Sequence, residues 1–252
     1  MSRFILKSLA LLCLGTQPWG VSAAESMTQE SRYQACMTKV EQFPQDAFED
    51  AIQWRDMDGG HPAQHCAASA LAALGLYKEA ATRLEHLAQK SRRGPNFRSE
   101  FLRQASQAWL LGGEATRAKI AASVGLKLNP TSDALLLDRA QAQALLADYA
   151  GAKADLDLVV ERNAKDVDAL AFRAAARRFL NDYVGAMDDA TRALTIDPNH
   201  EAALLERGNL HRLAGNRDLA RADWVHVTTI KPDGHAAASA RVNLERMDVV
   251  KD

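Results

Sequence analysis

Residues 167–200 read VDALAFRAAARRFLNDYVGAMDDATRALTIDPNH, and the pattern of this segment returns every 34 residues along the second half of the chain. Four columns share the spacing: one of leucine, one of alanine, one of small residues and one of residues that favour turns. The columns are Leu102, Leu136, Leu170 and Leu204; Ala118, Ala152, Ala186 and Ala220; Ser106, Ala140, Ala174 and Gly208; and Gly113, Ala147, Asn181 and Gly215. Four columns that agree on one register predict four repeats, at 99–132, 133–166, 167–200 and 201–234.

Each repeat is expected to fold as two packed helices. Residues with little or no side chain let two helices approach closely, and the large residues beside them fill the remaining space. Asn181 in the turn tolerates the backbone angles of a helix exit. Pro198 ends the second helix, because proline cannot extend a helix and suits the start of the next one. Pro130 and Pro232 hold the same position, and Ala164 replaces proline in the remaining repeat.

The period of 34, the identities of the columns and turns such as Asn181-Asp182-Tyr183 resemble those of the tetratricopeptide-repeat (TPR) family. The resemblance implies an all-α fold, an α-solenoid of TPR helix-turn-helix repeats in which antiparallel helix pairs stack side by side. It also implies a function in holding another protein or peptide, since stacked repeats curve into an extended concave surface.

The remaining segments match the repeat less well. Residues 61–98 predict a divergent TPR unit plus an insertion: Gly75-Leu76-Tyr77 has the form of the repeat turn, and four extra residues around 91–95 predict a loop or a slight dislocation. Residues 25–60 predict a degenerate amino-terminal helical cap, with a break at Phe43-Pro44. Residues 235–252 predict a capping helix and tail. Terminal repeats are commonly atypical because they close the stack.

The first 24 residues have the form of a signal peptide. Arg3 and Lys7 precede an apolar run that is too short to span a bilayer, and the small residues Ala23 and Ala24 offer cleavage sites. The alternative is an ordinary buried amino-terminal helix. Lipidation of Cys13 is not expected, because leucine precedes it where a lipobox has a small residue. We therefore expect a periplasmic or secreted protein with no membrane insertion after cleavage.

Cleavage would leave two cysteines, Cys36 and Cys66, in an oxidising compartment. In a TPR stack they would lie on the first helices of neighbouring units, so we expect a disulfide between them. Closure of a loop of about 30 residues would contribute about 3–4 kcal/mol of stability. The alternative is a pair of buried free thiols. The segment GGHPAQHC at 59–66 also resembles the amino-terminal region of exported proteobacterial TPR proteins.

Composition and motifs argue against several classes of function. Of 252 residues, 25% are charged and 47% are apolar, and the formal net charge is −1, so nothing indicates a nucleic-acid partner. No catalytic or phosphate-binding motif occurs, and we expect neither an enzyme nor a cofactor. His61 and His65 are spaced to share one helix face, but with Cys66 they form only three metal ligands, and no fourth ligand is evident at a useful spacing. Asp56-Met57-Asp58 resembles the start of a calcium loop, but Ala67 stands where the bidentate glutamate is needed.

The TPR resemblance places the partner-binding surface on the exposed side of the first helix of each repeat. The residues that it implies there are Arg103, Gln107, Leu137, Gln141, Arg178, Phe179, Asn209, Arg212 and Leu213. Guanidinium groups beside amides suit peptide backbone or carboxylates; the alternative is a solvated face without a ligand. The carboxylate clamp of some TPR proteins needs lysines on these helices, and their absence here argues against that class of partner.

Arg139, Arg173 and Arg207 form a further column at the same spacing. One interpretation is a ladder of arginines that binds an anionic ligand. We expect instead that these side chains pack their stems between helices and pair with a nearby acid such as Asp138 or Glu206.

The sequence thus predicts an exported TPR adaptor that holds a protein or peptide in its concave groove. The competing prediction is a self-assembling structural envelope protein.

Overall fold

The computed structural model describes residues 28–249, and this part of the chain is helical without any strand. The all-α solenoid that the repeat columns predict is therefore confirmed. The proposed signal peptide, residues 1–24, lies outside the described residues, as do 25–27 and 250–252. No helix within 28–249 is long and apolar enough to cross a bilayer.

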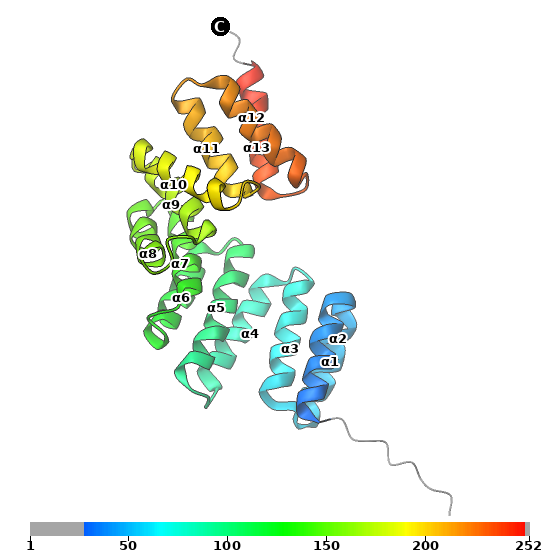
Figure 1. Cartoon of the computed structure of the whole chain (residues 1–252). Coiled ribbons are helices and arrows are strands. Elements are labelled where there is room, and N and C mark those ends of the chain that lie inside the picture. The colour runs from blue at the N-terminus through cyan, green and yellow to red at the C-terminus, as the bar shows by residue number, and fades with distance from the viewer. Residues whose placement is uncertain (1–27, 250–252) are drawn as a thin grey trace, which may run out of the picture.

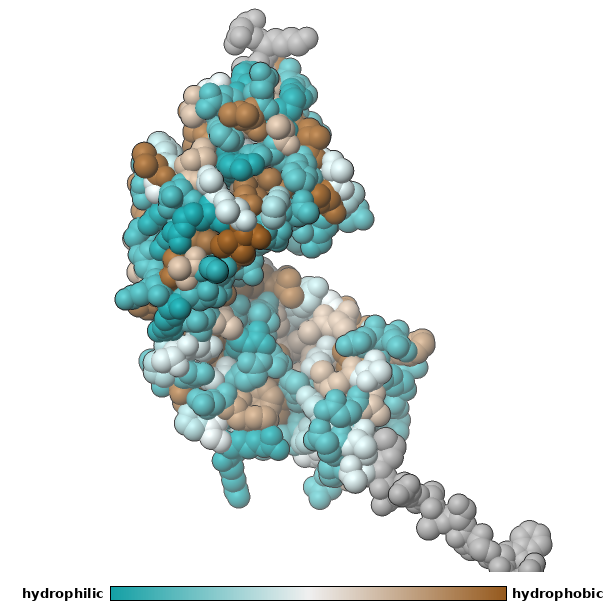
Figure 2. Space-filling view, in the orientation of Figure 1, coloured by the Kyte–Doolittle hydropathy of each residue, from teal (hydrophilic) through white to brown (hydrophobic). Residues whose placement is uncertain are grey.

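The helices form successive antiparallel pairs along an arc, with α1 near one end and α13 near the other (Figure 1). The pairs are α1 (Gln29–Gln42) with α2 (Pro44–Trp54), α3 (Gly60–Ala73) with α4 (Tyr77–Lys90), α5 (Pro95–Leu111) with α6 (Ala115–Leu128), α7 (Asp133–Leu145) with α8 (Tyr149–Arg162), α9 (Val167–Phe179) with α10 (Tyr183–Ile196), and α11 (Glu201–Leu213) with α12 (Arg217–Ile230). A short kinked link, η1 (Arg55–Gly59), joins α2 to α3, and α13 (His235–Val249) packs on α11 and α12. Figure 2 shows the molecule hollowed on one side, between the α11–α13 end and the α1–α5 end.

The repeat columns form the core between the two helices of each pair. All four residues of the alanine column are fully buried, and the members of the leucine column are at most 6% exposed. The column of small residues lies where the helices come closest. A Cβ atom added to Gly208 would lie 2.5 Å from the indole nitrogen of Trp224. Only a residue without a side chain permits this contact.

The turn column adopts the left-handed backbone conformation in every repeat. The φ angles are +75° at Gly113, +59° at Ala147, +63° at Asn181 and +81° at Gly215, and Gly75 in the divergent unit has +76°. Glycine enters this region without steric cost, and asparagine enters it more readily than other residues, whereas the Cβ atom of Ala147 is strained there. A shared turn geometry therefore repeats the same angle between the helices of each pair.

The four residues that exceed the 34-residue period before residue 99 lengthen α5. α5 has 17 residues, whereas α7, α9 and α11 have 13 each. The four extra residues add one turn to the amino-terminal end of α5, which starts at Pro95. The loop that the sequence predicts around 91–95 is confined to the link 91–94.

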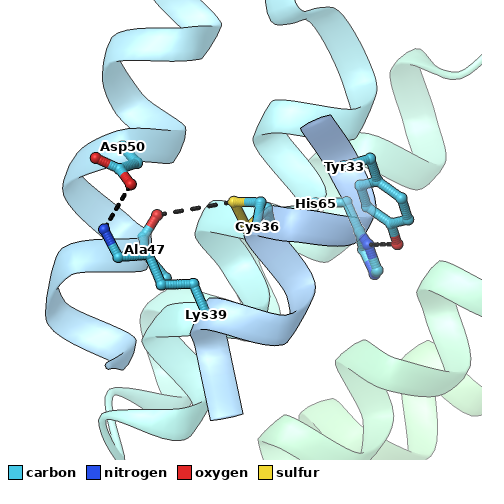
Figure 3. The surroundings of a disulfide bond; sticks show 7 residues. Tyr33, Cys36, Lys39, Ala47, Asp50 and His65 are labelled. Atoms are coloured by element: carbon cyan, nitrogen blue, oxygen red, sulfur yellow. Dashed lines mark hydrogen bonds and ion pairs between the residues drawn. A yellow bond between two sulfur atoms is a disulfide. The ribbon is translucent and has the colours of Figure 1, made fainter. Parts of the chain in front are cut away.

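A disulfide joins the amino-terminal pair to the next unit. Cys36 in α1 and Cys66 in α3 are bonded, with 6.2 Å between their Cα atoms, so the bond expected from the sequence is present (Figure 3). Ala47 and Ala51 of α2 are fully buried in the same cluster. The Sγ atom of Cys36 contacts the carbonyl oxygen of Ala47 at 3.9 Å, which is a packing contact because a disulfide sulfur carries no proton. The break between the first two helices lies where it was predicted, since α2 begins at Pro44.

We predict that Ala147→Gly stabilises the protein by about 0.5–1 kcal/mol, because glycine removes the strain of a left-handed alanine at a modest entropic cost. Ala154→Gly, at an exposed position inside α8, is the matched control and is expected to destabilise by about 1 kcal/mol. Urea denaturation followed by circular dichroism measures both changes. A loss of stability in Ala147→Gly as large as that of the control would contradict the prediction.

Candidate functional site

Four large apolar side chains are exposed at equivalent positions of successive repeats. Leu111, Leu145, Phe179 and Leu213 are the last residues of α5, α7, α9 and α11, the first helices of the four repeats. Their exposed fractions are 62%, 67%, 49% and 45%. We call these four residues the apolar stripe. Two of them, Phe179 and Leu213, are among the residues implied by the sequence; Leu111 and Leu145 are not, although the 34-residue spacing that links them was visible.

The middle of the apolar stripe borders a groove between α7, α8 and α9. The groove has a volume of about 410 Å³. Gln141, Leu145, Phe172 and Phe179 line it, and alanines of α7 and α9 lie between them. Small alanine side chains leave the space open that larger residues would fill. Of the predicted binding residues, the structure thus brings Gln141 and Phe179 together in one groove.

Phe179 is held in position by two neighbours. Its ring stacks on that of Tyr149, with centroids 4.2 Å apart and planes inclined by 5°. The guanidinium group of Arg178 lies 4.2 Å from the centre of the Phe179 ring. Because these contacts fix the ring while about half of its surface stays exposed, Phe179 presents a rigid apolar surface.

Arg178 and Asn209 have partners inside the protein. Two nitrogens of Arg178 donate to the two carboxylate oxygens of Glu206, at 2.6 and 3.1 Å. Asn209 donates to the same carboxylate at 3.2 Å and accepts a hydrogen bond from Asn243 of α13 at 3.0 Å. This network runs from α9 through α11 to α13 and ties the last elements of the stack together. Glu206 therefore holds the guanidinium group of Arg178 beside the Phe179 ring.

Two more predicted residues, Arg103 and Gln107 of α5, also face neighbours in the protein. Arg103 donates two hydrogen bonds to Glu100, at 2.8 and 2.5 Å, and Gln107 donates to Asp138 at 3.4 Å. Arg212, by contrast, is exposed and lines a hollow between α11 and α13 together with two other arginines. The remaining residue of the predicted set, Leu137, packs against the core.

The arginine column is structural, but its partners differ from the predicted ones. Each arginine pairs with an aspartate 16 residues later, in the second helix of its own repeat. The pairs are Arg139–Asp155, Arg173–Asp189 and Arg207–Asp223, with two hydrogen bonds of 2.6–2.9 Å in each. The suggested partners Asp138 and Glu206 were wrong. Each directly precedes an arginine on its helix, and adjacent residues on a helix do not face each other.

Asp138 is a buried carboxyl group without an ion pair. It is 4% exposed, and its Oδ2 atom has no hydrogen-bond partner among residues 28–249. Burial raises the pKa of Asp138 to about 6, although the nearby charge of Arg103 and the hydrogen bond from Gln107 act in the opposite direction. Ionised Asp138 therefore destabilises the fold at neutral pH.

The histidines near the disulfide are not arranged as metal ligands. Cys66 is bonded to Cys36, and both ring nitrogens of His65 have partners, the Tyr33 hydroxyl at 2.8 Å and Gln104 at 2.7 Å. Burial lowers the pKa of His65, so its ring is neutral at neutral pH. Within the described part of the chain, no three histidine, cysteine, aspartate or glutamate side chains form a metal-binding group.

Comparison of the sequence with models of protein families and with curated proteins gives no match. The structure is similar to solved ones: a tetratricopeptide-repeat protein from Parabacteroides merdae has a TM-score of 0.64 at 17% identity, with 87% of this chain and 93% of that chain covered. The chain has the TPR fold. Cut9, in the APC/C hetero-tetramer Cut9–Hcn1, has a TM-score of 0.67 at 14% identity, and the likeness covers 84% of this TPR chain and 42% of Cut9. MamA (41-end) from Desulfovibrio magneticus RS-1 has 0.56 at 18% identity, with 73% and 97% covered.

We predict that Asp138→Asn stabilises the protein by about 1–3 kcal/mol at pH 7, because it removes a buried charge whose pKa is raised. The folded state binds the proton more tightly than the unfolded state, so the stability of the wild type falls as pH rises through about 6. The gain should therefore disappear at pH 4. Urea denaturation at both pH values measures it.

Asp155→Asn is the matched control, because that carboxylate is buried as well but paired with Arg139. It should destabilise the protein by at least about 1 kcal/mol at pH 7. If both asparagine variants changed stability in the same direction at pH 7, the assignment of Asp138 as an unpaired buried charge would be wrong.

Proposed function

We propose that this TPR chain is a scaffold, not an enzyme, and that it binds another protein or peptide through the apolar stripe and the groove beside it. The observation that carries the proposal is the stripe: four large apolar side chains, each exposed by 45% or more, at one position of four successive repeats. Single exposed leucines are ordinary on protein surfaces, whereas a row that follows the repeat forms one extended apolar edge.

Burial of the apolar stripe supplies the binding energy in this proposal. Complete burial of a leucine or phenylalanine side chain contributes about 1.5–3 kcal/mol. Because the stripe residues are about half exposed, roughly half of that free energy would be gained when a partner covers them. Phe179 is the strongest anchor, since its stack on Tyr149 fixes the ring before a partner arrives. Gln141 places an amide at the wall of the groove, where it can bond to the backbone of a bound segment.

The partner that fits this surface is a protein segment with large apolar side chains. Arg212 precedes Leu213 at the α11 end of the stripe and adds an exposed positive charge there. The chain as a whole has a formal net charge of −1, so a nucleic-acid partner is not part of the proposal.

We further propose that the protein is periplasmic or secreted after removal of a signal peptide that ends at Ala23 or Ala24. The Cys36–Cys66 disulfide supports export, because such bonds persist in oxidising compartments. Amino-terminal sequencing of the mature native protein is expected to begin at Ala24 or Glu25. A mature chain that begins at Met1 would contradict export by this route.

Site-specific photo-crosslinking in the native cell tests the surface. A crosslinking amino acid at position 145 lies in the apolar stripe, and one at position 184 replaces Val184, which is 85% exposed on α10. We expect a defined partner to crosslink from position 145 only, and the product to be lost when Phe179→Ser is added. The Phe179→Ser variant must keep the helical circular dichroism and melting temperature of the wild type.

The other outcomes decide against the proposed surface. Equal products from positions 145 and 184, or a product that persists with Phe179→Ser, would move the contact elsewhere. A product of twice the mass of the chain would identify a second copy as the occupant, and would favour the self-assembling structural protein.

A further inference from the structure

A second hollow lies at the amino-terminal end of the stack, between α1, α3 and α5. Its volume is about 220 Å³, somewhat more than the cavity of about 150 Å³ that accommodates benzene in another protein. It therefore has room for one side chain. Aromatic rings form much of its wall and carboxylates lie beside them: the residues are Tyr33, His65, Phe97, Phe101, Glu30 and Glu100. We call this hollow the amino-terminal pocket.

A chain of hydrogen bonds across the three helices fixes the wall of the pocket. The Tyr33 hydroxyl lies 2.8 Å from Nδ1 of His65 (Figure 3), and Nε2 of His65 lies 2.7 Å from Oε1 of Gln104. The amide nitrogen of Gln104 donates to Glu100 at 3.0 Å, so its oxygen is the acceptor and Nε2 of His65 donates. Nδ1 then accepts from Tyr33. The disulfide next to this chain holds α1 against α3.

The charged groups that line the pocket include two carboxylates, Glu30 at the start of α1 and Glu100 on α5. Burial opposes ionisation of Glu100, but hydrogen bonds from Arg103 and Gln104 outweigh it and hold the pKa of Glu100 below its usual value. Burial raises the pKa of Tyr33, which stays neutral. Aromatic faces next to ionised carboxylates attract cations.

One side chain of the protein already shows this attraction. The guanidinium group of Arg93 lies 4.3 Å from the centre of the Phe97 ring, and Arg93 lines the pocket. Phe97 in turn packs edge-on against Phe101, with centroids 4.9 Å apart. Arg93 is exposed and belongs to the short link 91–94, so it can leave the ring without disturbing a helix.

We propose that the amino-terminal pocket binds one cationic side chain of a partner protein, lysine or arginine, which replaces Arg93 on the aromatic wall. The aliphatic stem of that side chain contacts the rings, and its charged group meets Glu30, because Glu100 is already paired with Arg103. Because the disulfide and the hydrogen-bond chain hold the walls in place without a ligand, little freedom is lost when the pocket is filled.

As a contact with a partner protein, this site rests on the proposed scaffold function and adds to it. α5 carries both Phe97 of the pocket and Leu111 of the apolar stripe, so one partner can contact the two surfaces. A small cationic probe reports on the pocket alone. Failure of the probe to bind is therefore distinguishable from failure of the apolar stripe to capture a partner.

The test titrates Nα-acetyl-arginine amide into the full mature chain. The citrulline analogue has the same shape without the charge and is the matched control probe. The readout is the NMR signal of the Gln104 side-chain amide and of the backbone amides of 97–101. We expect saturable shifts with the arginine probe and about tenfold weaker binding of citrulline. Equal binding of the two probes, or no shift at tens of millimolar, would overturn the proposal.

Variants at exposed positions provide effects of opposite sign. Arg93→Ala is expected to tighten binding of the arginine probe about threefold, because it removes a competing cation. Glu30→Gln is expected to weaken binding about threefold, whereas Glu41→Gln, exposed on the same helix outside the pocket, should bind like the wild type. Circular dichroism checks that each variant is folded. Weaker binding by Arg93→Ala, or equal effects of the two glutamine variants, would also overturn the proposal.

Discussion

Close contact between the two helices of each repeat is the constraint on which the rest of the structure depends. The alanine column is fully buried, and Gly208 lies directly against the indole of Trp224. Helices that meet at this distance have little freedom to shift, and the left-handed turn residues fix the angle between them. Each repeat is therefore a similar unit. A column that is buried in one repeat tends to be buried in all four, and a column that is exposed, such as the apolar stripe, is exposed in all four.

The buried arginine–aspartate pairs show that the same space between helices can be filled in two ways. Three repeats hold such a pair, whereas the repeat at 99–132 has the buried residues Ala105 and Ala121 at the same two positions. The arginine and the aspartate are both replaced in that repeat. Replacement of only one would leave a buried charge without a partner, which would cost about 3–5 kcal/mol. Relative to an apolar contact, the complete pair adds little net stability. Its two parallel hydrogen bonds instead fit one alignment of the helices, which a contact between alanines does not impose.

The repeat columns were sufficient to predict the fold because helix contacts within a repeat depend on residues close in sequence. The acids of the arginine pairs were also predictable, since Asp155, Asp189 and Asp223 have the same spacing, whereas Asp138 and Glu206 are nearer in the chain but lie on the same helix as the arginines. The partner of Arg178 was not predictable in this way. Glu206 lies in the next repeat, and its approach to Arg178 depends on how successive repeats are rotated. The apolar stripe has the same 34-residue spacing, but the sequence alone does not show that Leu111 and Leu145 are exposed.

The amino-terminal pocket lies where four residues are added to the 34-residue period. α7 starts at Asp133, so the corresponding start in α5 is residue 99, and residues 95–98 are the added turn. Phe97 belongs to that turn, and Arg93 belongs to the link before it. The added turn thus supplies an aromatic wall of the pocket, and the link before it supplies the cation that lies on that wall. The apolar stripe, by contrast, follows the period and recurs in each of the four repeats. The added turn, the disulfide and the hydrogen-bond chain together make the amino-terminal unit different from these repeats.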